Sequence, residues 1–216
     1  QYLDVLAEVD ACSAMNRCAE HIEVLNCNTK PDFFCTHLDI PYKVEDYSIE
    51  HMAIQVRLRL LEEFKNVYGV DISDDAIRAA VKEHNELCDV ITELSELRKL
   101  ENAPITGYEF AICTLVSYVC PTALILPYLK ETLEEVKARK LDPKPWYRAR
   151  VAIVGSEIDD PNLTKLIEDV GALVVSDRYC FGSTPGREII ERAVGALSEE
   201  TYLDEAKNLA EFHHEK

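Results

Sequence analysis

The sequence predicts an α/β fold with two βαβ units and a helical segment between them. The clearer unit lies between residues 151 and 183, where two short apolar runs, Val151–Val154 and Ala172–Val175, each end in a polar loop. A helix fits the segment between the two runs, with Asp160 as N-cap and Pro161 as its first residue. Strands connected through a helix in this way are parallel, and we expect both to be buried on both faces.

The first unit follows the same order of elements near the beginning of the chain. Leu3 to Val9 reads as a strand, a helix fits Ala14 to Leu25, and Phe33 to Ile40 reads as a second strand closed by Pro41. The apolar positions of this helix recur at helical spacing. They are Met15, Cys18, Ile22 and Leu25.

Helix signals fill the middle of the chain. Ser48 is the expected N-cap of a helix that ends at Gly69, and Ser73 that of a helix reaching about Leu100. Further helices are expected from Gly107 to Val119, from near Pro127 to the run KETLEEVKARK, over 187–197 and over 205–214. The proline-containing stretch LDPKPWYRAR suggests a domain boundary. The predicted division is 1–44 for the first α/β lobe, 45–145 for the helical connector and 146–216 for the second lobe.

Composition excludes several classes of partner. A formal net charge of −17 without a basic stripe argues against binding to a nucleic-acid backbone. No apolar run is long enough to cross a membrane, and no signal peptide is recognisable, so we expect a cytoplasmic protein. The eight cysteines are then expected to be buried, catalytic or metal-binding thiols. Because the chain starts directly in a strand-like run, we expect it to be a piece of a longer subunit.

Two cysteines stand where side chains can carry chemistry. Cys12 and Cys180 each lie in a polar loop after a predicted strand, where ligands of parallel sheets bind. Thiolates spread singly along a chain suit an iron–sulfur cluster held between lobes, and do not suit a zinc ribbon, which needs local pairs. The alternative is that each is a small buried hydrophobe. No Walker loop, GxGxxG, HExxH, GxSxG or CxxC motif occurs.

The other cysteines and the histidines have simpler interpretations. Cysteines on apolar helix faces or within a strand are assigned to the core, whereas two cysteines in turns remain open as ligands. His37, in the strand THLDIP, is interpreted as a structural histidine with satisfied hydrogen bonds, and the last two histidines as solvated. The core assignments are Cys18, Cys35, Cys88 and Cys113, the open ones are Cys27 and Cys120, and the solvated pair is His213 and His214.

Four segments carry a resemblance to a known family. VDACSAMNR, FFCTHLDIPYK, GSEIDDP and DRYCFGSTPGRE, with the helices between them, resemble the 2-hydroxyacyl-CoA dehydratase/benzoyl-CoA reductase family over residues 1–195. GSEIDDP and DRYCFGSTPGRE are most similar to a substrate-reducing subunit of ATP-dependent benzoyl-CoA reductase.

The resemblance implies two doubly wound parallel-sheet lobes with a [4Fe–4S] cluster bound between them by cysteines. Cys12 matches the family's cluster cysteine in the pattern xxCxxMxR, and Cys180 matches the cysteine of the DxxCxGS loop. An acyl-CoA substrate, a homologous sister subunit and a separate ATP-hydrolysing activator with its own cluster are implied as well. The family's earlier and later ligand cysteines have no counterpart here, and the similarity fades after Ser198.

The expected function is that of an iron–sulfur oxidoreductase subunit that passes low-potential single electrons to the ring of an aromatic acyl-CoA such as benzoyl-CoA. One alternative is a lyase subunit that dehydrates a 2-hydroxyacyl-CoA with a recycled electron. Another is a non-catalytic subunit whose cluster only relays electrons or stabilises the complex. The sequence does not identify the catalytic proton donors.

Overall fold

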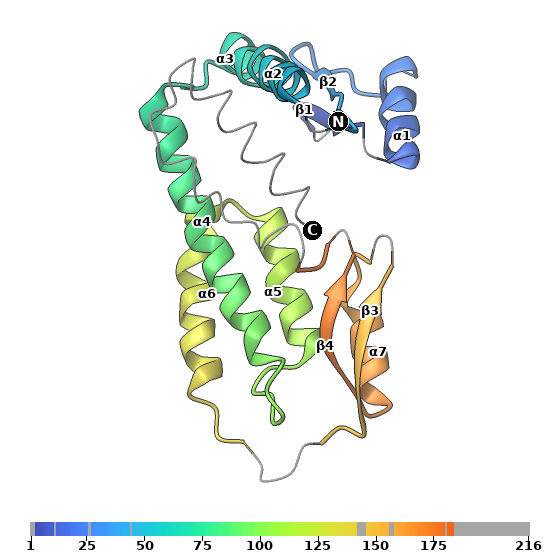
Figure 1. Cartoon of the computed structure of the whole chain (residues 1–216), viewed down its shortest axis with the longest axis vertical. Coiled ribbons are helices and arrows are strands. Elements are labelled where there is room, and N and C mark those ends of the chain that lie inside the picture. The colour runs from blue at the N-terminus through green and yellow to red at the C-terminus, as the bar shows by residue number, and fades with distance from the viewer. Residues whose placement is uncertain are drawn as a thin grey trace. The chain divides into compact units, whose positions relative to one another are not determined.

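The computed structural model confirms the α/β class (Figure 1). It describes residues 3–10, 12–25, 27–43, 45–141, 146–155, 158–179 and 181–183. These residues divide into two compact units, the first up to Ala79 and the second from Ala80 onward. The elements in chain order are β1 (Val5–Val9), α1 (Ser13–Val24), β2 (Phe34–Leu38), α2 (Asp46–Gln55), η1 (Val56–Leu61), α3 (Glu62–Tyr68), α4 (Asp74–Leu97), α5 (Gly107–Val119), α6 (Thr122–Lys137), β3 (Ala149–Val154), α7 (Pro161–Asp169) and β4 (Ala172–Arg178).

The first unit contains a parallel strand pair, as predicted. β1 and β2 run in register from Val5 opposite Phe34 to Val9 opposite Leu38, and α1 connects them. Only Ala19 of α1 is buried. The expectation that Cys18 lies in the core is therefore wrong, because the apolar stripe of α1 that carries it is not packed within the described part of this unit.

A helical stretch of three consecutive elements, α2, η1 and α3, lies beside β2. The side-chain amide of Gln55 exchanges two hydrogen bonds with the backbone of Asp39, at 2.8 and 2.9 Å, and fixes this stretch against the end of the strand. Ser48 is not the N-cap, because α2 begins at Asp46 and Ser48 is buried in its first turn. Gly69 ends α3 as predicted, in the left-handed conformation with φ of 65°.

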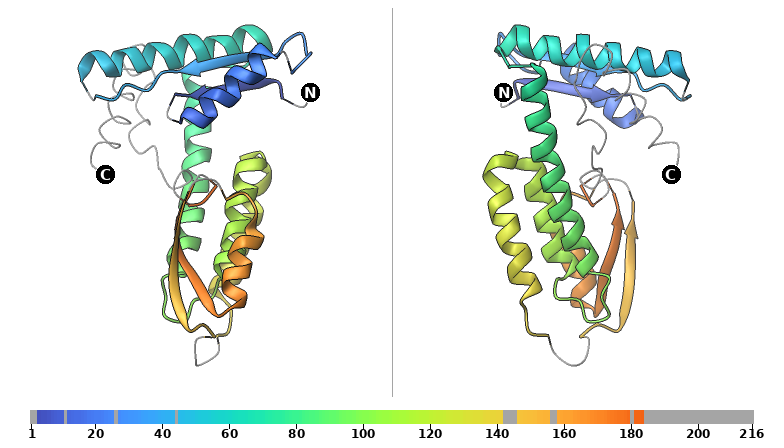
Figure 2. Two further views of the ribbon diagram at one scale, coloured as in Figure 1. Left: turned by 90° about the vertical axis from the view of Figure 1, so that its right-hand side faces the viewer. Right: turned by 60° about the vertical axis from the view of Figure 1, so that its left-hand side comes forward.

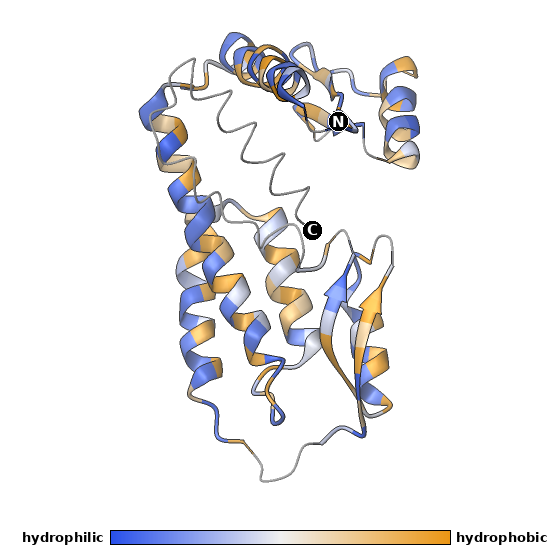
Figure 3. Cartoon of the chain, viewed as in Figure 1, coloured by the Kyte–Doolittle hydropathy of each residue, from blue (hydrophilic) through white to orange (hydrophobic). Residues whose placement is uncertain are grey.

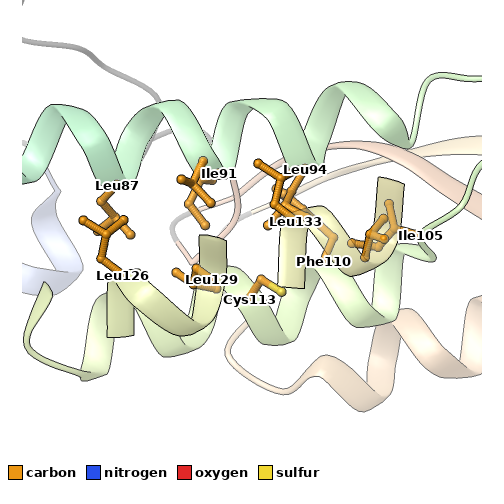
Figure 4. Packing of buried hydrophobic residues seen from close by; sticks show 11 residues of the cluster. Leu87, Ile91, Leu94, Ile105, Phe110, Cys113, Leu126, Leu129 and Leu133 are labelled. Carbon is orange, nitrogen blue, oxygen red and sulfur yellow. The ribbon is translucent and has the colours of Figure 1, made fainter. Parts of the chain in front are cut away.

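The hydrophobic core of the second unit lies between α4, α5 and α6 (Figure 4). Apolar residues one helical turn apart on α4, such as Ile91 and Leu94, pack against Phe110 of α5 and leucines of α6. α5 begins at Gly107 as predicted, because Thr106 and Glu109 form a capping box. α6 begins at Thr122 rather than near Pro127 and carries that exposed proline in its interior.

β3, α7 and β4 form the second predicted βαβ unit, and its strands are parallel. Asp160 caps α7 as expected, since its Oδ1 accepts a hydrogen bond from the Asn162 amide at 2.9 Å. β4 contains the fully buried Leu173 and Val174, but β3 is not buried on both faces, and Val154 is 75% exposed. The reason is that α5 and α7 both pack against β4, whereas β3 is the outer strand of the described pair (Figure 2). Figure 3 shows the apolar residues that β3 leaves uncovered.

The two-unit division cuts through α4, between Ala79 and Ala80. It groups α5 and α6 with the second βαβ unit and α2 and α3 with the first. The three-part division at 44/45 and 145/146 stays a prediction. The helices expected over 187–197 and 205–214 lie outside the described residues. Among the helices of the described ranges, none combines the length and the apolar character needed to span a membrane.

Candidate functional site

An open cavity of about 320 Å³ lies at the carboxyl ends of β1 and β2, where a parallel pair presents its loops. Its walls come from the two strands, from the beginning of α1 and from η1. Acidic side chains predominate, so the cavity attracts hydrogen-bond donors and positive charge. The lining residues are Glu8, Asp10, Asn16, Glu20, His37, Asp39 and Arg59.

A carboxylate–imidazole pair forms one wall of this cavity. Glu8 and His37 face each other across the strand pair, and Glu8 Oε2 lies 2.8 Å from His37 Nδ1. Glu8 is buried, and its Oε1 has no hydrogen-bond partner among the described residues. The hydrogen bond to Glu8 raises the pKa of His37 above its ordinary value, with a smaller electrostatic contribution from Glu23. The pair can therefore hold a proton at His37 Nδ1, and the interpretation of His37 as a satisfied histidine agrees with this geometry.

Cys12 lies next to the cavity, at the N-cap position of α1. Its backbone carbonyl accepts the first helical hydrogen bond, from the Asn16 amide at 3.0 Å. Its side chain caps nothing, and the residue is exposed. An exposed thiol at the beginning of a helix, at the carboxyl edge of a parallel strand pair, is placed to act as a nucleophile or as a metal ligand.

The other described cysteines are free thiols in different surroundings. Burial raises the pKa of Cys113 to about 11, so this thiol stays protonated and serves as a core residue. Cys88 is fully buried, and its Sγ lies 3.3 Å from His84 Nε2. Burial also raises the pKa of the half-buried Cys35. Of the two turn cysteines left open, Cys27 is exposed and Cys120 is half-buried.

Residues around the second candidate cysteine are held by a buried carboxylate. Cys180 itself lies outside the described residues. Asp177, near the end of β4, accepts hydrogen bonds from Arg98 at 2.7 Å and from the Ser183 amide at 2.6 Å. The loop after β4 therefore has its entry and its end connected through one side chain.

No metal site is complete within the described ranges. No three His, Cys, Asp or Glu side chains there lie close enough together to bind a metal ion. Cys12 fits an iron–sulfur cluster as one thiolate ligand, and the described residues bring no second cysteine to it.

Two polar pairs were not identified from the sequence as parts of a site. One is Glu8 with His37, and the other is Arg98 with Asp177. A charged residue inside an apolar strand, such as Glu8 in LDVLAEV, is the signal that marks the first pair. Asp177 directly follows a buried run, but nothing near Arg98 in the sequence indicates its partner 79 residues away.

Comparison with known proteins then identifies the family. A family profile described as "2-hydroxyglutaryl-CoA dehydratase, D-component" matches residues 1–212. The chain belongs to this family. As a member of the D-component family, it is also similar to one of the subunits of benzoyl-CoA reductase from Thauera aromatica. The identity is 28% over 154 residues, which cover 69% of this chain. The match spans 39% of the length of that relative.

Proposed function

We propose that this chain is part of an iron–sulfur subunit of an ATP-dependent aromatic acyl-CoA reductase, with Cys12 and Cys180 as ligands of a [4Fe–4S] cluster. The observation that carries the proposal is the position of Cys12, an exposed, unengaged thiol at the carboxyl edge of a parallel strand pair. Family membership and the similarity to a benzoyl-CoA reductase subunit support it. The beginning of a helix favours negative charge, as a metal-bound thiolate carries.

When bound, the cluster supplies one-electron transfer at a potential set by burial and by hydrogen bonds to its sulfurs. The chain's own residues contribute a thiolate at Cys12 and a proton held at His37 Nδ1 by Glu8. The thioester carbonyl of an aromatic acyl-CoA helps the reduction because it delocalises the added charge. The proposal also includes a homologous sister subunit and a separate ATP-hydrolysing activator, in a cytoplasmic complex.

The second candidate is a subunit of a 2-hydroxyacyl-CoA dehydratase, and the description of the family profile favours it. Loss of water from a hydroxyacyl thioester is redox-neutral, so the electron that starts the reaction is returned. Reduction of one ring double bond instead consumes two electrons and two protons in every turnover.

The ratio of ATP hydrolysed to product formed separates the two candidates. The complete complex, purified without oxygen, is tested with benzoyl-CoA and with a 2-hydroxyacyl-CoA side by side. A reductase hydrolyses ATP in fixed proportion to the dihydro product. Sustained turnover of the hydroxyacyl substrate after a single activation identifies the dehydratase. A cluster without binding of either acyl-CoA identifies a subunit that only relays electrons.

A further inference from the structure

A buried ion pair lies at the carboxyl end of β4 in the second unit. Arg98 Nη1 donates to Asp177 Oδ2 at 2.7 Å, and both side chains are 1% exposed. Arg98 Nη2 donates to Ser95 Oγ at 2.8 Å, and the guanidinium carbon lies 3.6 Å from the centroid of the Phe110 ring. The arginine is thus held on several sides by α4 and α5. Burying two charges costs desolvation energy, so such a pair is weak evidence for a role in stability alone.

The second oxygen of the same carboxylate holds the loop that follows β4. Asp177 Oδ1 accepts a hydrogen bond from the Ser183 amide at 2.6 Å. Inside the loop, the Gly182 amide donates to the carbonyl of Tyr179 at 3.0 Å, which closes a turn. The described residues on both sides of position 180 are therefore connected to Asp177.

Tyr118 of α5 fixes the same loop from the helical side. Its hydroxyl donates to the carbonyl of Gly182 at 3.1 Å, and its ring packs edge-on against Phe181. A Cβ on Gly182 would lie 2.4 Å from Asp177 Oδ1. The carboxylate and the loop fit so closely that a displaced Asp177 also displaces Gly182 and Ser183.

We infer that Arg98 is a positioning residue for the loop over 177–183, acting through the two carboxylate oxygens of Asp177. The inference rests on the proposed function, in which this loop supplies the ligand Cys180. Arg98 fixes one carboxylate oxygen, and the other oxygen fixes the end of the loop. The role requires the bidentate arrangement of one carboxylate between a guanidinium and a backbone amide, so a neutral apolar pair cannot replace it.

Two variants test the inference in the complete complex prepared without oxygen. Arg98→Met combined with Asp177→Leu removes both charges together, because losing one alone leaves an uncompensated buried charge. Gly182→Ala keeps both charges and displaces the loop by steric contact. Gly155→Ala is the matched control, since no atom lies within 4 Å of its added Cβ.

Three readouts are compared: hydrogen exchange of the peptide that contains Ser183, the electron paramagnetic resonance spectrum of the reduced cluster, and iron loss to a chelator. We expect faster exchange, a changed spectrum and iron loss faster by about tenfold, the scale of an outer-shell change at a metal site. Unchanged exchange in both variants overturns the positioning role, whether or not iron is present. Faster exchange with unchanged spectrum and iron loss overturns the link to the cluster. A wild-type complex without iron contradicts the proposed function, and exchange alone then decides whether Arg98 positions the loop.

Discussion

Glu168 of α7 caps α5 through the amide of Gly107, which donates to Glu168 Oε1 at 2.7 Å across 61 residues of sequence. The Tyr108 amide donates to Oε2 at 3.0 Å, and the Val174 amide donates to Oε1 at 3.2 Å. One buried carboxylate therefore connects the βαβ unit to the helical core at the positive end of α5.

Replacing Glu168 by Ala should destabilise the protein by about 3 kcal/mol, because buried amides lose a charged acceptor. Glu168→Gln keeps an acceptor oxygen but puts an NH₂ group against one of the amides, so its loss should be smaller. Denaturant unfolding measures both variants. Glu131, exposed on α6, provides the control Glu131→Ala, for which we expect a change below about 0.5 kcal/mol. Equal effects of Glu168→Ala and Glu131→Ala would rule out the capping role.

Gly107→Ala should also destabilise, although alanine ordinarily favours a helix. The added Cβ would lie 2.6 Å from the Cβ of Val174 and 2.8 Å from its carbonyl oxygen. Overpacking of this kind costs about 1–3 kcal/mol. Gly155→Ala has open space around it and should leave the unfolding midpoint unchanged. A midpoint of Gly107→Ala at or above wild type would show that the contact between α5 and β4 is looser than described.

The pH dependence of His37 follows from its contact with Glu8. Because the pKa is raised in the folded state, protonated His37 stabilises the fold fully below the unfolded pKa of 6.5, and this contribution is lost as pH rises through the folded pKa. NMR titration of the imidazole should give a folded pKa above 6.5. Glu8→Gln should lower it more than Glu23→Gln, since the Glu8 hydrogen bond is the largest cause of the shift. A titration unaffected by Glu8→Gln would contradict the pair.

Local signals predicted the elements whose ends are marked by caps. Asp160 with Pro161, Gly69, and the start of α5 at Gly107 all agree with the structure. Burial was less predictable, because it depends on what packs against an element. The apolar stripe that carries Cys18 and the apolar run that ends at Val154 both proved exposed, and neither residue's own sequence neighbourhood shows that.

The candidate site divides in the same way. The place of Cys12 after β1 follows from the order of strand and helix, which is local information. The partners that organise each loop come from distant segments, as Arg98 does for Asp177 and as His37 does for Glu8. Such pairs are set by the register of parallel strands and by tertiary packing. A single sequence does not encode them in any short pattern.

The role of Cys12 is tested most directly by the iron and acid-labile sulfide content of the complex purified without oxygen. Cys12→Ala should lose most of the cluster iron of this subunit. Cys18→Ala removes another exposed thiol from the same helix, and Cys88→Ala removes a buried one, so both should retain wild-type iron. Equal iron in Cys12→Ala, Cys18→Ala and wild type would contradict the assignment of Cys12 as a cluster ligand.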